Sequence, residues 1–314
     1  MNLNKAAAVL LKTPGNIEIQ ELFLDPLKEG DVLVENLYSG VSTGTERLLF
    51  EGRMPEFPGM GYPLVPGYEC FGRVVEKSKS SKINIGEMVF VPGATCYGEI
   101  KGLFGGASSH LVVNEKRIVK MTRGENQENI LLALAATAQH VINTGNKLPN
   151  LIIGHGTLGR LLARIIVLNG GSPIVVEKSA DRRKGQFDYE VLSPAEIIGK
   201  KFDCVVDVSG DAKKLDFFIS LLKKQGELVL AGFYQDSISF DFVPTFLREI
   251  RLRVSAQWEQ KDLDEVSTAV NSGKLDLSGL ITHSISAKKA NFAYETAFNN
   301  PSCLKMVIDW KEFH

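Results

Sequence analysis

Cysteine is scarce in this sequence, long apolar runs are missing, and neither sign of charge is in excess. The four cysteines, Cys70, Cys96, Cys204 and Cys303, stand far apart, without the paired spacing of a zinc knuckle or a disulfide framework, so we expect free thiols. No apolar run approaches the roughly 20 residues of a membrane span, and no basic segment followed by an apolar core opens the sequence. These absences predict a cytoplasmic protein without a membrane span.

The balance of positive and negative residues indicates which kind of molecule the protein binds. The chain has 36 Lys and Arg residues against 37 Asp and Glu residues, which gives a formal net charge of −1. Because a basic excess is missing, the chain offers no electrostatic footprint for nucleic acid, and we expect a small molecule as the partner. With 314 residues the chain is longer than the about 250 to 300 residues that one hydrophobic core supports, which predicts two domains.

The segment at 151–177 carries the strongest motif. An apolar run too short for a helix, Leu151–Ile153, stops at GHGTLG (154–159), which fits the G-x-G-x-x-G pattern. The first glycine permits the tight turn, the second lets the backbone approach a pyrophosphate, and the third lets the next helix pack on the sheet. Apolar residues at helical spacing follow, so the free N–H groups of that helix point at the turn. The segment therefore predicts a dinucleotide site.

An acidic residue at the end of the next predicted strand bears on the choice of dinucleotide. Glu177 stands where this fold places a carboxylate against the ribose hydroxyls, and it would repel a 2′-phosphate. The basic residues Lys178, Arg182 and Arg183 follow directly, and such residues accept the extra phosphate in some sites. NAD is favoured over NADP on this evidence.

The order of patterns predicts an α/β protein with two domains. Short alternating runs separated by Gly and Pro turns fill the first part of the chain, as in an irregular antiparallel β barrel. A helical pattern at 126–143 follows as a hinge helix, and strands then alternate with helices, including a helix expected over Lys214–Lys224, so the second sheet should be parallel and doubly wound. Residues 281–310 read as strand, helix and strand that fold back onto the barrel. We assign 1–124 with 281–314 to the barrel domain and 125–280 to the nucleotide-binding (Rossmann) domain.

This architecture resembles the medium-chain dehydrogenase/reductase superfamily, whose barrel is GroES-like, along nearly the whole chain. In its zinc alcohol dehydrogenases, a Cys, a His and a second Cys hold the catalytic metal. The matching positions here are Ser42, Tyr68 and Ala133, none of which is a good zinc ligand. Only Cys96 lies where the structural zinc lobe has its four cysteines. The resemblance therefore implies a member without a protein-bound metal.

Five segments of the first 110 residues resemble the bacteriochlorophyllide a dehydrogenase (BchC) family more closely. They are SGVSTGTER (39–47), GRMP (52–55), PGMGYPLVPGYE (58–69), FVPGA (90–94) and GLFGGA (102–107). The resemblance implies oxidation of the 3-(1-hydroxyethyl) group of a bacteriochlorophyllide-type tetrapyrrole to 3-acetyl, with NAD as acceptor, in bacteriochlorophyll biosynthesis. A homodimer through the nucleotide domain is common in the superfamily.

The resemblance also assigns the polar groups around the missing metal. The catalytic candidates are Tyr68, Ser42, Thr43, Glu69 and His140, with Tyr68 bound to the substrate oxygen and Glu69 or His140 connecting it to solvent. Structural alternatives stay open. Tyr68 fills the space of the metal, Glu69 pairs with an arginine such as Arg47, His140 is a satisfied core histidine, and the two hydroxyl residues bond the turn backbone.

Binding residues follow from the glycine turn and the resemblance together. The cofactor is assigned to Gly154, Gly156, Thr157, Leu158, Gly159, Glu177, Lys178 and Arg182, with Thr45 and Thr137 at the nicotinamide and Ser209 and Gly232 at strand ends. A flat macrocycle needs a broad apolar cleft, for which the candidates are Phe57, Met60, Tyr62, Tyr97, Phe104 and Trp258.

Two other functions are compatible with the same sequence. A zinc-free quinone or enone reductase that uses NADPH shares the fingerprint and the missing metal ligands. A pigment carrier that keeps the fold without turnover is the second alternative, although the intact glycine turn and Glu177 speak against lost cofactor binding.

Overall fold

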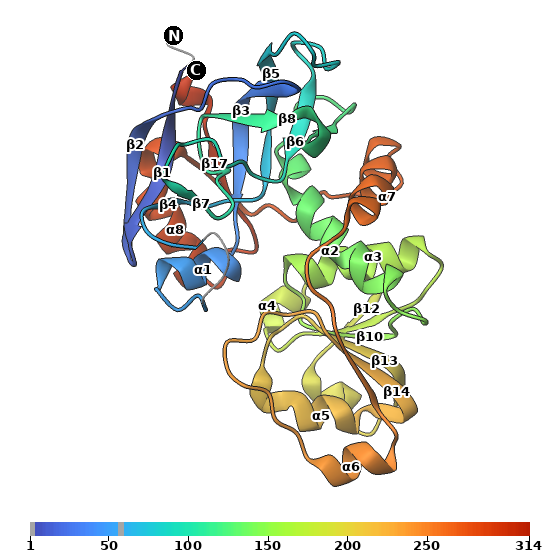
Figure 1. Cartoon of the computed structure of the whole chain (residues 1–314). Coiled ribbons are helices and arrows are strands. Elements are labelled where there is room, and N and C mark those ends of the chain that lie inside the picture. Colours follow the sequence, from blue (N-terminus) through green and yellow to red (C-terminus); the bar gives the residue numbers. More distant parts are fainter. Residues whose placement is uncertain (1–3, 56–59) are drawn as a thin grey trace. The chain divides into compact units, whose positions relative to one another are not determined.

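The computed structural model describes residues 4–55 and 60–314, and the chain divides into two compact units. The first unit comprises Met1–Ala133 and Leu277–His314, and the second comprises Leu134–Asp276 (Figure 1). Residues 125–133 thus belong with the first unit, whereas the sequence analysis assigned them to the nucleotide-binding domain. The division falls inside the expected hinge helix, which the structure resolves into η2 (Gln127–Leu131) and α2 (Leu132–Asn143).

The first unit is built from two sheets whose strands are separated by Gly and Pro turns, as the sequence predicted. One sheet has the order β2, β1, β4, β7, with bounds Asn16–Phe23, Lys5–Thr13, Leu64–Val65 and Lys101–Gly102. The other has the order β16, β17, β3, β5, β6, β9, with bounds His283–Ser286, Met306–Asp309, Asp31–Val41, Cys70–Lys77, Met88–Val91 and Val119–Lys120, and β8 (His110–Asn114) also pairs with β3. Besides η2, the helices of the first unit are α1 (Thr45–Phe50), η1 (Glu115–Arg117), η5 (Ala287–Lys289), α8 (Ala290–Asn299) and η6 (Lys311–Phe313).

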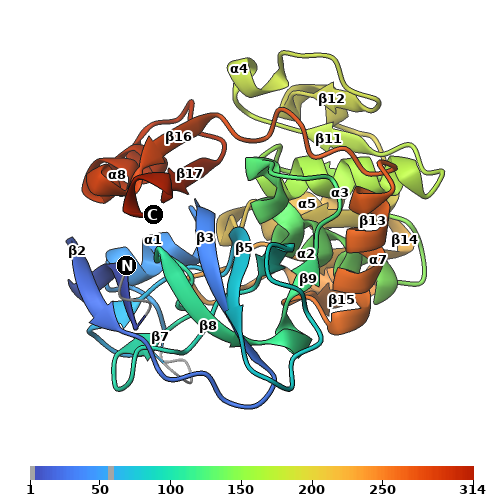
Figure 2. The same cartoon turned by 90° about the horizontal axis from the view of Figure 1, so that it is seen from above.

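The last part of the chain returns to the barrel, which confirms the prediction for residues 281–310. Strand β17 pairs antiparallel with β3, with Val307 opposite Gly40, and β16 extends the same sheet (Figure 2). Helix α8 contributes Tyr294 and Phe298 to a core cluster that also holds Trp310. The long strand β3 therefore carries two partners on one side, β8 along its first half and β17 along its second.

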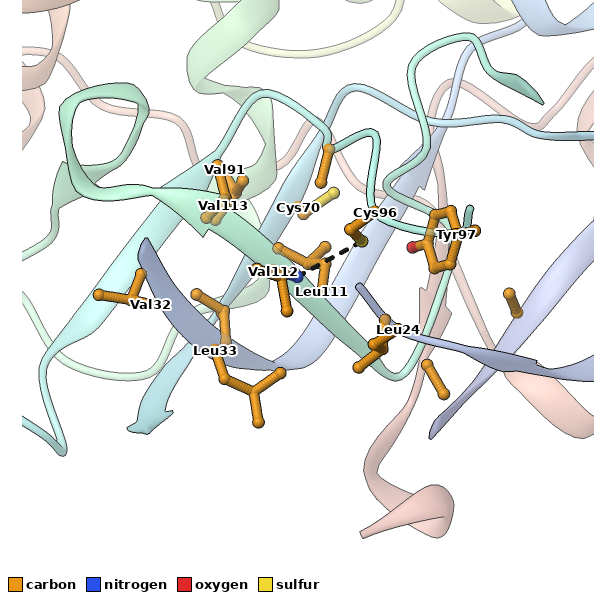
Figure 3. Close-up of a cluster of buried hydrophobic side chains, with 14 of the residues drawn as sticks. Leu24, Val32, Leu33, Cys70, Val91, Cys96, Tyr97, Leu111, Val112 and Val113 are labelled. Carbon is orange, nitrogen blue, oxygen red and sulfur yellow. Dashed lines mark hydrogen bonds between the residues drawn. The ribbon is translucent and has the colours of Figure 1, made fainter. Parts of the chain in front are cut away.

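A second core cluster fills the barrel beneath β5, β6 and β8. It contains Cys70, Cys96 and Tyr97 among aliphatic side chains such as Leu111 (Figure 3). Tyr97 is 4 % exposed, and its hydroxyl donates to Gly105 O at 2.8 Å. All four cysteines are free and buried, which confirms the prediction of free thiols.

The second unit is a parallel sheet in the order β12, β11, β10, β13, β14, β15, and this confirms the predicted doubly wound fold. The strand bounds in that order are Glu190–Leu192, Ile174–Val176, Leu151–Ile153, Phe202–Asp207, Leu222–Leu230 and Arg251–Val254. The helices are α3 (Thr157–Leu168), α4 (Ala180–Arg183), η3 (Pro194–Ile197), η4 (Ala212–Lys214), α5 (Leu215–Ser220), α6 (Phe242–Leu247) and α7 (Gln260–Asn271). Figure 1 shows α3 and α5 on opposite faces of the sheet.

One helix prediction was wrong. The helix expected over Lys214–Lys224 ends at Ser220, and Leu222 already belongs to β14, where it pairs with Phe202 of β13. Spacing along the sequence allowed Leu222 to continue the apolar face of the helix. The backbone instead satisfies its hydrogen bonds in the sheet, beginning with Phe202 N–H donating to Leu221 O at 2.8 Å.

Helix α6 was not predicted, and its apolar side chains are exposed. Phe242, Val243, Phe246 and Leu247 are each more than 60 % exposed. None of the helices among the described residues has the length and apolar character of a membrane span.

Candidate active site

The glycine turn has the shape that a dinucleotide needs. Gly154 has φ +108°, a conformation that side-chain-bearing residues rarely adopt, directly after β10. A Cβ on Gly159 would lie 2.0 Å from Gly154 O, so only glycine lets α3 approach the turn this closely. A Cβ on Gly156 would meet nothing within 4 Å, and no side chain caps the first turn of α3. The open face at Gly156, at the start of a helix whose N-cap residue has no side chain to cap it, fits a pyrophosphate.

Two glycine variants should separate cofactor binding from folding. We expect Gly156→Ala to raise the Kd for the dinucleotide by at least about tenfold, because the new methyl group occupies the pyrophosphate position. Its melting temperature should stay unchanged, since nothing lies within 4 Å of the added carbon. Gly159→Ala is the matched variant and should lose both affinity and stability. Fluorescence titration with NADH and thermal unfolding measure the two effects, and an unchanged Kd for Gly156→Ala would contradict a cofactor at this turn.

Glu177 is fixed next to the turn. Its Oε2 accepts from His155 N–H at 3.0 Å and its Oε1 from Ser179 N–H at 2.7 Å, and the residue is 6 % exposed. Each carboxylate oxygen has a further lone pair for a ribose hydroxyl. Of the basic residues, Arg183 donates to Glu177 O at 2.8 Å, whereas Lys178 is exposed.

Sequence reasoning missed two residues that hold the cofactor end of this sheet together. His155, inside the glycine turn, is fully buried, with Nδ1 2.8 Å from Arg182 O and Nε2 3.0 Å from Tyr189 Oη. Asp207, at the end of β13, accepts from the N–H groups of Ser209 and Gly210, each at 3.0 Å. A polar residue at the end of a buried strand, or in the turn that follows it, was the available signal for both. The strand-end residues Ser209 and Gly232 are thus positioned by Asp207, whose main-chain oxygen accepts from Gly232 N–H at 2.9 Å.

In the first unit, two of the catalytic candidates are in contact. Tyr68 Oη donates to Ser42 Oγ at 2.9 Å, and the Tyr68 ring packs edge-on against Phe104 with centroids 5.1 Å apart. The third position that matches a zinc ligand, Ala133, is buried. The residues at these positions offer a phenol, a hydroxyl and a methyl group; the first two form hydrogen bonds, and none of the three is a usual zinc ligand.

Burial and nearby carboxylates control the charge of this cluster. Burial, followed by the negative charges of Glu69 and Glu46, raises the pKa of Tyr68 far above its usual range, against hydrogen bonds with Ser42 and Thr45. The phenol is therefore neutral at ordinary pH. Glu46, which sequence reasoning did not single out, is 2 % exposed and accepts from Ser42 N–H through Oε2 and from Tyr294 Oη at 3.2 Å through Oε1.

The buried Glu46 should make stability depend on pH. Burial raises the pKa of Glu46 from 4.5 to about 7, so the folded protein holds this proton more tightly than the unfolded chain does. The free energy of unfolding should therefore fall as pH rises from about 4.5 to about 7, by about 3 kcal/mol from this group. Urea unfolding of the wild type and of Glu46→Gln across that range measures the effect. The wild type should lose more stability than the variant, and parallel curves would contradict the assignment.

Glu69 forms a buried ion pair with a residue that the sequence analysis did not identify. Its carboxylate contacts Lys305 Nζ, and the two side chains are 1 % and 3 % exposed. Burial raises the pKa of Glu69, and the Lys305 ammonium opposes that shift. The alternative partner suggested from sequence, Arg47, instead contacts Glu51 Oε1 at 2.8 Å. The lone lysine inside the apolar stretch LKMVI (304–308) was the only local signal.

His140 lies in the second unit, where it pairs with Asp262. Its Nδ1 is 2.7 Å from Asp262 Oδ2, and Asn143 donates to Asp262 Oδ1 at 2.7 Å. The same carboxylate accepts from Glu259 N–H at the start of α7. These contacts join α2 to α7 and give His140 the structural role that the sequence analysis left open. The cluster around Tyr68, in contrast, consists of residues of the first unit.

The remaining candidates fall into different environments. Thr43 is exposed, Thr45 begins α1, and Thr137 lies half-buried on α2. Tyr97 belongs to the barrel core and is not available to line a substrate cleft.

Four substrate candidates keep exposed surface. Met60, Tyr62 and Phe104 are half-buried against one core cluster of the first unit, and Trp258 is half-buried after β15 in the second. The Tyr62 hydroxyl donates to Leu49 O at 2.5 Å. Phe57 lies outside the described residues.

Comparisons with known proteins agree with this architecture. Residues 28–123 match the family described as the alcohol dehydrogenase GroES-like domain. An alcohol dehydrogenase of Escherichia coli CFT073, solved in complex with NADH, superimposes with a TM-score of 0.83 at 19 % identity and covers 98 % of this chain and 100 % of that one. The 2R,3R-butanediol dehydrogenase of Bacillus subtilis gives a TM-score of 0.84 at 19 % identity, with 97 % and 99 % covered.

Two sequence relatives are much more similar. The 2-desacetyl-2-hydroxyethyl bacteriochlorophyllide A dehydrogenase of Cereibacter sphaeroides is 46 % identical over 98 % of this chain and 99 % of that protein. The protein of the same name from Rhodobacter capsulatus is 49 % identical over 90 % and 91 %.

Proposed function

The chain belongs to the bacteriochlorophyllide a dehydrogenase family, and we propose that it oxidises the 3-(1-hydroxyethyl) group of a bacteriochlorophyllide-type tetrapyrrole to a 3-acetyl group. The similarity of nearly the whole chain to two dehydrogenases named for that substrate carries this proposal. In the reaction, a secondary alcohol and NAD⁺ give a ketone, NADH and one proton. The step belongs to the biosynthesis of bacteriochlorophyll.

A nicotinamide dinucleotide is the cofactor of this proposal, and NAD is favoured over NADP. The open face at Gly156 and the uncapped start of α3 support binding of the pyrophosphate. The buried carboxylate of Glu177 supports NAD, because a 2′-phosphate next to it would be repelled.

We further propose that the oxidation proceeds without zinc. Zinc in related enzymes stabilises the alkoxide, so another group has to bind the alcohol oxygen here. The Tyr68 and Ser42 hydroxyls stand at two of the three positions that match the ligands. The substrate itself lowers the activation barrier for hydride transfer, because the conjugated macrocycle delocalises positive charge that develops on the carbinol carbon.

We assign transfer of the substrate's hydroxyl proton to residues of the first unit. A bound nicotinamide supplies the hydride acceptor. Neutral Tyr68 donates to Ser42 Oγ, which leaves lone pairs on its oxygen to accept the O–H of the alcohol. As the C–H bond breaks, the alcohol proton moves to Tyr68 Oη while the phenol proton moves to Ser42 Oγ and the Ser42 hydroxyl proton leaves for solvent, so both residues end neutral.

One assay tests the proposed reaction. Chelator-treated protein is incubated with NAD and a 3-(1-hydroxyethyl) bacteriochlorophyllide, and the pigment absorbance is followed together with NADH. We expect one NADH for each acetyl group formed, with slower turnover when NADP replaces NAD. Reduction of small quinones with NADPH in place of this reaction would favour the enone reductase, and pigment binding without turnover would favour the carrier. Zinc independence is wrong if chelation abolishes turnover in a still folded protein and zinc restores it.

We propose a homodimer formed by the second unit. β15 is an edge strand of the sheet and its residues Arg251, Leu252 and Val254 are exposed. Exposed Phe242 and Phe246 of α6 lie nearby along the chain. Because an exposed edge strand with apolar neighbours favours association, we expect Val254→Asp with Phe246→Asp to convert a dimer to a monomer in light scattering. A monomeric wild type would contradict the proposal.

A further inference from the structure

A cluster of three metal-binding side chains lies on the barrel sheet, at the point where two strands meet along β3. Glu35 of β3 stands directly opposite His110 of β8, and the chain that leaves β17 through η6 brings His314 to the same place. One ligand atom from each of the three residues lies within 4.8 Å of the other two. Among the residues that the structure describes, no other group of His, Cys, Asp and Glu side chains meets this condition.

The hydrogen bonds of His314 orient its free nitrogen toward the other two groups. Its Nε2 is 3.1 Å from Asn36 O, and a carbonyl oxygen only accepts, so Nε2 carries the proton. Its Nδ1 therefore presents a lone pair, is buried, has no hydrogen-bond partner, and lies 4.0 Å from Glu35 Oε2. A metal-binding histidine usually donates one ring N–H to a backbone carbonyl or a carboxylate and binds the ion through its other nitrogen. The lone pairs of His314 Nδ1 and Glu35 Oε2 would repel each other unless a cation lay between them.

The second imidazole distinguishes a metal from a simple ion pair. The His110 and His314 rings stand edge to face with centroids 5.2 Å apart, and Ser109 Oγ lies 3.1 Å from His110 Nδ1, where it holds the ring. A proton would bridge only two of the three groups, whereas a metal ion binds all three. Ligand atoms in a tetrahedral zinc site stand roughly 3.3 Å apart, so the 4.0 Å separation closes with a small side-chain movement.

We propose that Glu35, His110 and His314 bind one divalent transition metal ion of the zinc class. Two imidazoles and one carboxylate suit Zn²⁺, with water at the remaining position. The ion would tie the segment after η6 to β3 and β8. Glu35 and Ser42 are seven residues apart, roughly 23 Å along an extended strand, so this ion would be structural and would not touch an alcohol bound at Tyr68.

Cobalt binding tests the site without reference to activity. Purified protein is stripped with a chelator, dialysed into metal-free buffer and titrated with Co²⁺, whose visible spectrum reports four-coordinate binding. We expect one Co²⁺ per chain, displacement by Zn²⁺ and a higher melting temperature with the metal. His314→Ala and Glu35→Gln should each weaken binding by at least about tenfold. These variants are preferred to a change at His110, whose burial puts folding at risk.

His283→Ala is the matched control, because it removes a histidine from the same unit and leaves the cluster intact; it should bind Co²⁺ like the wild type. Absence of a cobalt spectrum in the wild type, or unchanged affinity in either cluster variant, would overturn the proposal. Since the readout is metal binding, its failure leaves the proposed pigment oxidation untouched, and failure of that oxidation leaves this site untouched. If the purified protein contains zinc, its loss in His314→Ala and Glu35→Gln would assign the ion to this cluster.

Discussion

Tyr68→Phe should lower kcat for pigment oxidation by about 10² to 10⁴, the range that a positioned proton-transfer group contributes. The variant keeps the ring that packs on Phe104 and loses only the hydroxyl that contacts Ser42. Its melting temperature and its affinity for NADH should therefore stay close to those of the wild type. Because the pKa of Tyr68 lies far above its usual range, the loss should be similar at about pH 6 and about pH 9.

Tyr38→Phe is the control for this experiment. Tyr38 is a buried phenol of β3 in the same unit, and its hydroxyl donates at 3.2 Å to Glu125, which is not one of the candidate catalytic residues. This variant should keep the wild-type kcat. Full activity of Tyr68→Phe would remove the phenol from the chemistry and leave it the alternative role of filling the space of a lost metal.

Lys305→Met should lower the free energy of unfolding by about 3 to 5 kcal/mol, the usual effect of leaving one charge of a buried pair without its partner. Glu69 is fully buried and Lys305 is 2 % exposed, so water replaces neither partner. The pair also explains Gly40, because a Cβ there would lie 2.0 Å from Glu69 Oε2 and 3.0 Å from Lys305 Cε. Urea unfolding at one fixed pH measures the loss.

A double-mutant cycle separates the pair from the packing of the lysine chain. Glu69→Gln together with Lys305→Met removes both charges and should recover most of the lost stability. Lys223→Met is the matched control, since Lys223 pairs with Asp203 at 2.8 Å where the two side chains are 51 % and 44 % exposed. Its effect should stay below about 1 kcal/mol. If Lys305→Met and Lys223→Met lost the same free energy of unfolding, the buried pair would contribute no more to stability than an exposed pair.

Local patterns predicted the parallel sheet and the glycine turn of the second unit. An apolar run, a glycine turn and a helix with apolar residues at helical spacing occur within one short segment, and the backbone geometry at Gly154 and Gly159 follows from those residues alone. The pattern failed where two structures fit the same spacing. Leu222 suits the face of a helix, yet it pairs with Phe202 because the sheet supplies its hydrogen bonds.

The chemistry of the first unit was only partly predictable. The motif around Ser42 and Tyr68 identified two hydroxyls that the structure brings within 2.9 Å. The burial of Glu46 was not predicted, because nothing in the sequence distinguishes a buried glutamate in a short helix from an exposed one. The partner of His140 was also out of reach, since Asp262 lies in another helix far along the chain.

The sequence by itself determined the parallel sheet, the dinucleotide turn, the missing zinc ligands and the family, because each is written in neighbouring residues or in a continuous motif. Only the tertiary structure decided which ionisable side chains lie together. Lys305 reaches Glu69, and His314 reaches Glu35 and His110, because β17 and η6 return to β3 from the far end of the chain. Contacts of this kind leave no periodic pattern in a sequence. They matter for the stability of the fold, because a buried charge is tolerated only where the fold places a partner beside it.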